Sequence, residues 1–194
     1  MPLRKKISLY HQQKEIKPLI EDIINEYLDG DIKNTALDFV AYIRENNMKP
    51  VWALTNSWKI SYKSKGIFYI RICMEKKYNA YGPIGTSWVI TPYFSHIHEY
   101  EESIVNEGLH NIICDNVFHC VHSGRSDSSG AGCNPNKSCA GGATKTVFGK
   151  ELKGLCVSRP LIWFYDPDET AIDCIKRLLE LEQNAREENK NKEK

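Results

Sequence analysis

Apolar residues near the start of the chain follow the period of an α-helix. They recur at steps of three and four residues, at Ile16, Leu19, Ile20, Ile23, Ile24, Tyr27 and Leu28. Such a stripe covers one face of a helix and predicts that this face is buried. A second stripe of the same period, between residues 34 and 46, predicts a second helix. We expect the two helices to pack against each other.

The period then shortens to two, which is the period of a β-strand. Apolar and polar residues alternate from Trp58 to Tyr62 and again from Phe68 to Cys73, and Gly66 lies between these segments. Two alternating segments joined by a short turn that contains glycine indicate a β-hairpin. A third strand is predicted over residues 87–91. We therefore expect an antiparallel sheet.

The second half of the chain is expected to add helices and strands to this sheet. A helix is predicted within residues 100–118, strands at 146–148 and 161–165, and a last helix that Asp166 caps. Residues 183–194 are charged and have no apolar face, so we expect a disordered tail there. The predicted fold is α+β, an antiparallel sheet packed against helices, in a single domain of residues 1–182. A cysteine-rich lobe at residues 119–156 precedes the last strands and the C-terminal helix.

Composition and charge limit the kinds of partner that this protein can bind and the compartment in which we expect it. The chain has 194 residues, of which 41% are hydrophobic, and this length suits one domain with a substantial core. The formal net charge is +1 and acidic and basic residues are interspersed, so the sequence shows no basic region of the kind that binds nucleic acid or an anionic membrane. No apolar run approaches the roughly 20 residues of a membrane span. We therefore expect a soluble, cytoplasmic protein.

Four of the seven cysteines lie in one glycine-rich stretch: Cys120, Cys133, Cys139 and Cys156, with His119 and His122 at its start. Thiolates and imidazoles are ligands of tetrahedral zinc, and clustered cytosolic cysteines more often bind metal than form structural disulfides. A loop this polar buries too little apolar surface to order itself, and a bound metal would supply the missing stability. We predict a zinc ion held by the four cysteines, with His122 and His119 as reserve ligands. Two alternatives stay open: a reduced loop whose thiols have no role, and a redox-active or disulfide-forming pair.

The same stretch resembles a group of small bacterial proteins of uncharacterised function. Those proteins carry a Cys-x2-Cys pair, then Cys-Ala-Pro-Gly, then Phe-Gly-Lys-Glu-Phe and a last cysteine. The similar segments here are Asn116–Cys120, Cys139–Gly142, Phe148–Leu152 and Cys156. The resemblance implies a cysteine-rich module and no particular activity. This chain has Ser123 where the pattern has its second cysteine, and Cys133 is the residue that would replace it.

Several aromatic residues lie on or beside the predicted strands, and they allow two interpretations. Aromatic residues of a sheet that face a layer of helices ordinarily belong to the core. Tryptophan and tyrosine also line small-molecule pockets, because they combine flat apolar area with a polar tip. Trp58, Tyr62 and Trp88 are the residues that we assign to such a pocket. His96 and His98 would face the same way on an extended segment, which gives a second, weaker hypothesis for a metal site.

Together these features favour a non-enzymatic zinc-binding protein that acts as a small-molecule-binding or regulatory module. Four protein ligands leave no open position for water on zinc, so such a site is structural. The first alternative is an enzyme that depends on zinc with three protein ligands, or on a reactive thiol. The second is a nucleic-acid-binding knuckle that would use Arg125, Lys137, Lys145 and Lys150. Oligomeric state leaves no signal in the sequence.

Overall fold

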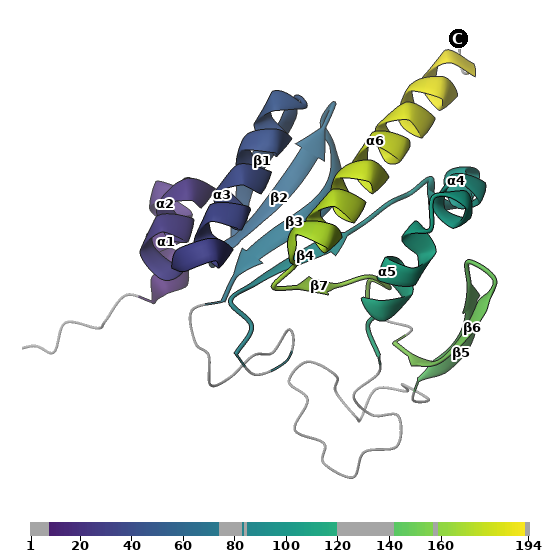
Figure 1. Cartoon of the computed structure of the whole chain (residues 1–194). Coiled ribbons are helices and arrows are strands. Elements are labelled where there is room, and N and C mark those ends of the chain that lie inside the picture. The colour runs from purple at the N-terminus through teal and green to yellow at the C-terminus, as the bar shows by residue number, and fades with distance from the viewer. Residues whose placement is uncertain (1–7, 74–82, 84, 120–141, 157–158, 193–194) are drawn as a thin grey trace, which may run out of the picture.

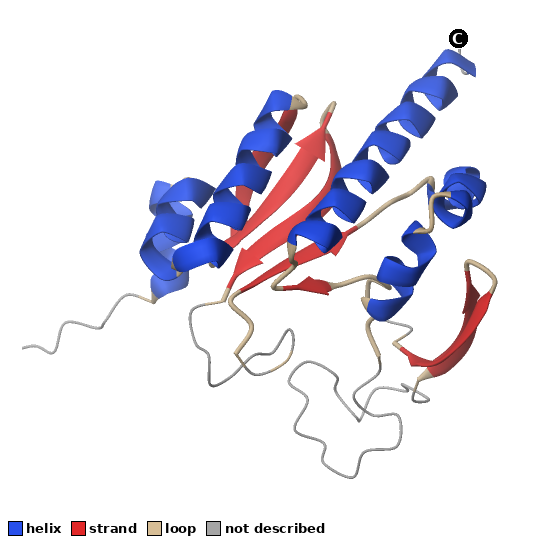
Figure 2. Ribbon diagram, in the orientation of Figure 1, coloured by secondary structure: helices blue, strands red, loops and turns tan. Residues whose placement is uncertain are grey.

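The computed structural model describes residues 8–73, 83, 85–119, 142–156 and 159–192. Three helices come first: α1 (Leu9–Ile16), α2 (Ile20–Tyr27) and α3 (Gly30–Glu45). Four strands follow: β1 (Met48–Leu54), β2 (Ser57–Tyr62), β3 (Lys65–Ile72) and β4 (Trp88–Pro92). Next come the 3₁₀-helix η1 (Ile97–Tyr100) and the helices α4 (Glu101–Asn106) and α5 (Leu109–Asp115). The order ends with β5 (Ala143–Val147), β6 (Lys150–Leu155), β7 (Phe164–Tyr165) and the long helix α6 (Glu169–Lys192) (Figure 2).

Strands β1 to β4 and β7 form one antiparallel sheet in the order β1-β2-β3-β4-β7. Helices α3 and α6 lie across the same face of this sheet, with α1 and α2 beside α3 (Figure 1). Strands β5 and β6 pair only with each other, as a separate antiparallel hairpin. The predicted α+β fold, with its antiparallel sheet, its helices and a helix at the C-terminus, is confirmed.

The main core fills the space between the sheet and its helices. Alternate residues of the strands supply the sheet side of this core, namely Trp58, Ile60, Phe68, Ile70, Trp88, Ile90 and Phe164. Phe39 of α3 packs on two of them, with its ring centroid 5.9 Å from that of Phe68 and 6.4 Å from that of Trp88. Leu178 and Leu179 of α6 are fully buried in the same core. A smaller cluster beneath the β5–β6 hairpin contains Cys114, Val117, Val147 and Leu155.

The first apolar stripe is divided between two helices. Lys17 adopts a left-handed conformation with a φ of 47°, and Pro18 follows it, so the chain turns between α1 and α2. Four residues of the stripe are buried as predicted: Ile20, Ile23, Ile24 and Leu28. Ile16 and Leu19, in contrast, are 71% and 59% exposed. The prediction of one helix through residues 16–28 is therefore wrong, because its first turn cannot continue through the proline.

The start of α6 also differs from its prediction. The side-chain Oδ1 of Asp168 accepts a hydrogen bond from the Ala171 N–H at 2.8 Å, so Asp168, and not Asp166, caps the helix. The Asp166 carboxylate instead accepts hydrogen bonds from the N–H groups of Ser87 and Trp88, at 2.8 and 2.9 Å. Asp166 thereby ties the chain after β7 to the beginning of β4.

The end of α6 differs more strongly, because residues 183–192 are helical where a disordered tail was predicted. Ala185 is only 7% exposed. Glu187 accepts a hydrogen bond from the Tyr62 hydroxyl and forms an ion pair with Lys63 at 2.7 Å. The last turns of the helix therefore contact the body of the protein.

Candidate functional site

The predicted zinc site lies mostly outside the described residues. Cys120, Cys133, Cys139 and the reserve ligand His122 all belong to the undescribed range 120–141. Cys156 is described: it directly follows β6 and is 2% exposed. Its backbone N–H donates a hydrogen bond to the carbonyl oxygen of Phe118 at 3.2 Å. The chain immediately before Cys120 therefore lies against the chain at Cys156.

Two further contacts bring the flanks of the cysteine-rich stretch together. His119 forms an antiparallel β-bridge with Leu155, and its ring Nδ1 lies 3.2 Å from the carbonyl oxygen of Lys153. Gly142 packs so closely on the backbone of Gly154 that a side chain at position 142 would overlap it. Residues on both sides of the undescribed range 120–141 thus meet at the end of β6. The tight turn at the other end of this hairpin, where Gly149 has a φ of 76°, makes this approach possible.

The described residues by themselves do not form a metal site. No group of three or more His, Cys, Asp or Glu side chains among them is placed to hold an ion. His119 is exposed. Within the described part of the chain, the zinc hypothesis therefore rests on the position of Cys156 and on the convergence of the flanking segments.

The second histidine pair does not have the geometry that was expected. His96 precedes the 3₁₀-helix η1 and His98 lies within it, so the two residues are not on an extended segment. The ring Nδ1 of His96 lies 2.8 Å from Glu99 Oε1 and 3.1 Å from Asn189 Nδ2. His98 is exposed. These contacts occupy His96 in the folded chain and leave no paired histidine site there.

The three aromatic residues that were assigned to a pocket belong to the core. Trp58 and Trp88 are each 1% exposed and Tyr62 is 8% exposed. The indole N–H of Trp58 donates a hydrogen bond to the carbonyl oxygen of Pro18 at 3.1 Å, and the Tyr62 hydroxyl donates to Glu187. All three belong to the main core cluster. The core interpretation of these residues is the one that the structure supports.

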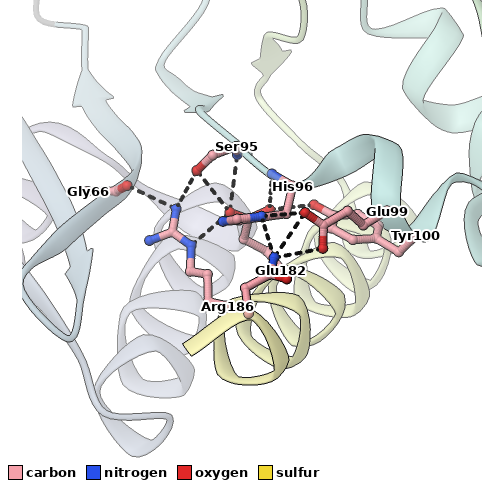
Figure 3. A network of polar contacts seen from close by, with 8 residues as sticks. Gly66, Ser95, His96, Glu99, Tyr100, Glu182 and Arg186 are labelled. Atoms are coloured by element: carbon pink, nitrogen blue, oxygen red, sulfur yellow. Dashed lines mark hydrogen bonds and ion pairs between the residues drawn. The ribbon is translucent and has the colours of Figure 1, made fainter. Parts of the chain in front are cut away.

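A buried polar network that the sequence did not predict joins α6 to the segment after β4 (Figure 3). At its centre, Glu182 is fully buried. Its Oε1 accepts hydrogen bonds from the Ser95 N–H at 3.1 Å, the Ser95 hydroxyl at 3.3 Å and Arg186 Nε at 2.7 Å. Its Oε2 accepts from the His96 N–H at 3.2 Å and the Tyr100 hydroxyl at 2.8 Å. We call Glu182, Arg186, Ser95, His96 and Tyr100 the Glu182 network.

Arg186 extends this network to the sheet. Its Nη2 donates hydrogen bonds to the Ser95 hydroxyl at 3.1 Å and to the carbonyl oxygen of Gly66 at 3.4 Å. Its Nη1 is buried and has no hydrogen-bond partner among the described residues. Burial, together with the nearby Glu182 carboxylate, raises the pKa of Tyr100 far above its usual value, so its hydroxyl remains a donor. The Glu182 side chain, which accepts five hydrogen bonds, fixes residues 95–100 against α6, and Arg186 extends the contact to β3.

A comparison of the chain with protein-family models, with curated proteins and with solved structures finds no match in any of the three. None of the helices in the described part of the chain is long and apolar enough to cross a membrane.

Proposed function

We propose that this chain is a zinc-binding protein in which the metal is structural and is held by Cys120, Cys133, Cys139 and Cys156. The observation that carries the proposal is the meeting of residues 118–119, 142 and 154–156 at the end of β6. Residues 118–119 are far in sequence from the hairpin ends at residues 142 and 154–156, and each of these segments lies at or near one of the cysteines. A shared metal ion gives a chemical reason for such a meeting.

Chain connectivity limits how far two of these cysteines can lie from Cys156. Cys120 follows His119 directly, so their α-carbons are about 3.8 Å apart. Cys139 precedes Gly142 by three residues, a distance that a fully extended chain spans in at most about 11 Å. Both His119 and Gly142 contact the last residues of β6. The short connections support a site shared with Cys156, and Cys133 completes the set of four.

The burial of Cys156 favours a structural over a catalytic metal. A zinc ion bound to a thiolate that is 2% exposed has little contact with bulk water on that side. Four thiolates also fill the tetrahedron, which leaves no position for a water molecule or a substrate. Such a site would stabilise the cysteine-rich lobe and shape its surface for a small-molecule or regulatory role.

The proposal is tested by metal analysis of the purified, reduced protein and of single Cys→Ser variants. We expect one zinc ion per chain in the wild type and a clear loss of zinc when Cys120, Cys139 or Cys156 is replaced. Cys174→Ser is the matched control, since Cys174 is a buried cysteine of α6 and lies outside the proposed site. Wild-type protein without stoichiometric metal, or full zinc content in all of the ligand variants, would refute the proposal.

A further inference from the structure

The sheet has a hollow on the face opposite α3 and α6. It has a volume of about 330 Å³ and is lined by Lys59, Gly66, Tyr69 and Tyr93, and by Phe68, which also belongs to the core on the other side of the sheet. Lys59 and Tyr69 are paired across β2 and β3, and they alternate with the core residues of those strands. Their side chains therefore point away from the helices. We call this site the sheet hollow.

Lys59 supplies a positive charge to the sheet hollow. Its side chain lies across Gly66, and a Cβ at position 66 would come within 2.4 Å of Lys59 Cε, so the lysine would have to move. The glycine therefore makes room for the lysine on the surface of β3. Among the described residues, no carboxylate lies within ion-pair distance of the Lys59 ammonium group. No carboxylate in the described part of the chain therefore competes with an external anion for this charge.

Two tyrosines supply the aromatic part of the sheet hollow. The rings of Tyr69 and Tyr93 meet edge to face, with their centroids 5.4 Å apart and their planes at 68°. Tyr93 is 47% exposed, so part of its ring is open to solvent. Burial of the rest of the side chain raises the pKa of Tyr93, and the positive charges of Arg71 and Arg159 oppose that rise. The Tyr93 hydroxyl therefore remains a donor at neutral pH, and Arg71 and Arg159 bring positive charge to its surroundings.

The basic and aromatic character extends along the sheet toward β7. The guanidinium group of Arg159 lies 5.7 Å from the ring centroid of Phe118 and 5.9 Å from that of Trp163. The rings of Phe118 and Trp163 are in turn 4.9 Å apart. Arg159 is held by these rings close to the sheet, and its charge also reaches Tyr93. This face therefore combines cations with flat rings, which is the chemistry that binds planar aromatic anions.

We propose that the sheet hollow binds a small planar aromatic anion of the mononucleotide type. The aromatic ring of the ligand lies against Tyr93 and Tyr69, and its anionic group pairs with Lys59. A volume of about 330 Å³ is at the lower end of the range for small-molecule pockets and suits a ligand of this size. This inference concerns another part of the chain than the zinc proposal and does not depend on it.

Isothermal titration calorimetry with AMP as the probe tests this inference on the full chain as purified. We expect saturable binding that Lys59→Gln and Tyr93→Leu each weaken by about tenfold, because each removes one of the two contacts. The matched controls are Lys14→Gln and Tyr10→Leu, which make the same changes on α1, and they should bind AMP within about twofold of the wild type. Adenosine and inorganic phosphate, each of which makes only one of the two contacts, should bind more weakly than AMP.

Three results would overturn the inference. The first is the absence of saturable AMP binding up to about 10 mM, which is weaker than any specific site of this size would give. The second is equal binding by the wild type and both hollow variants. The third is binding of a ten-residue oligothymidylate about a hundredfold tighter than AMP, which would assign the face to single-stranded nucleic acid. Circular dichroism and zinc content, measured on the same variants, separate a failed ligand site from a failed fold or a failed zinc site.

Discussion

Replacement of Glu182 by alanine is expected to destabilise the protein more than any other single change at a charged residue of α6. The side chain of Glu182 is 0% exposed and that of Arg186 is 9% exposed, and their ion pair is 2.7 Å long. Glu182→Ala removes the acceptor for five hydrogen bonds. It leaves the Arg186 guanidinium and the Tyr100 hydroxyl buried without this partner, and it also removes the acceptor of the Ser95 and His96 N–H groups.

The magnitude follows from the cost of an uncompensated buried charge. Removal of one partner from a buried, hydrogen-bonded ion pair costs about 3–5 kcal/mol. For a chain of this size, each kcal/mol lowers the melting temperature by about 2–4 °C, so we expect a decrease of about 6–20 °C. Arg186→Ala should also destabilise. The double variant should cost less than the sum of the two single variants, because neither charge is then left buried alone.

The assay is thermal and urea denaturation of the wild type, the two single variants and the double variant. Glu180→Ala serves as the control on the same helix, since Glu180 forms an exposed ion pair with Arg177 at 2.9 Å. We expect this control to change the free energy of unfolding by at most about 1 kcal/mol. A Glu182→Ala variant that unfolds within about 0.5 kcal/mol of the wild type would refute the structural role of the Glu182 network.

Three further predictions concern the helices. Deletion of residues 183–194 removes Arg186 and should lower the free energy of unfolding, measured by urea denaturation, by about 3 kcal/mol or more. An unchanged urea midpoint would instead support the prediction that these residues are a disordered tail. Ile24→Ala should lower the free energy of unfolding by about 2–5 kcal/mol because Ile24 is fully buried, whereas Ile16→Ala, at an exposed position, should lower it by less than about 0.5 kcal/mol. Similar losses for the two variants would contradict the division of the apolar stripe between α1 and α2. Burial raises the pKa of Cys174 to about 12, so iodoacetamide at pH 8 should label this thiol only after the protein unfolds. Peptide mass spectrometry measures the labelling, and rapid labelling of the native protein would show that α6 opens.

Periodicity predicted most of the elements that build the core. The alternation from Trp58 to Tyr62 and the cluster of isoleucines at 20–24 identified faces that are buried in the structure. Strand β1 was missed, because Pro50 and the partly exposed residues around it give no clear alternation. The division between α1 and α2 was also missed, although Pro18 is the residue that signals it. Local pattern thus located the buried faces better than the ends of the elements.

The Glu182 network could not be predicted from local pattern. Glu182 and Arg186 are four residues apart on a helix, a spacing that usually indicates an exposed ion pair. Here the Glu182–Arg186 ion pair is buried because residues 95–100, more than 80 positions away in sequence, pack over it. The sheet hollow was likewise missed, because Gly66 was assigned to a turn and its role in seating Lys59 depends on strand pairing. Of its residues, Phe68 and Tyr93 carried the available signal, as aromatic residues on or beside predicted strands.

The most direct test of the zinc proposal is X-ray absorption at the zinc edge of the purified, reduced wild-type protein. We expect one zinc ion per chain with four sulfur neighbours at about 2.3 Å and no water ligand. Protein without bound zinc would contradict the proposal outright. A shell of three protein ligands and one oxygen from water would contradict the structural role and assign the metal to catalysis.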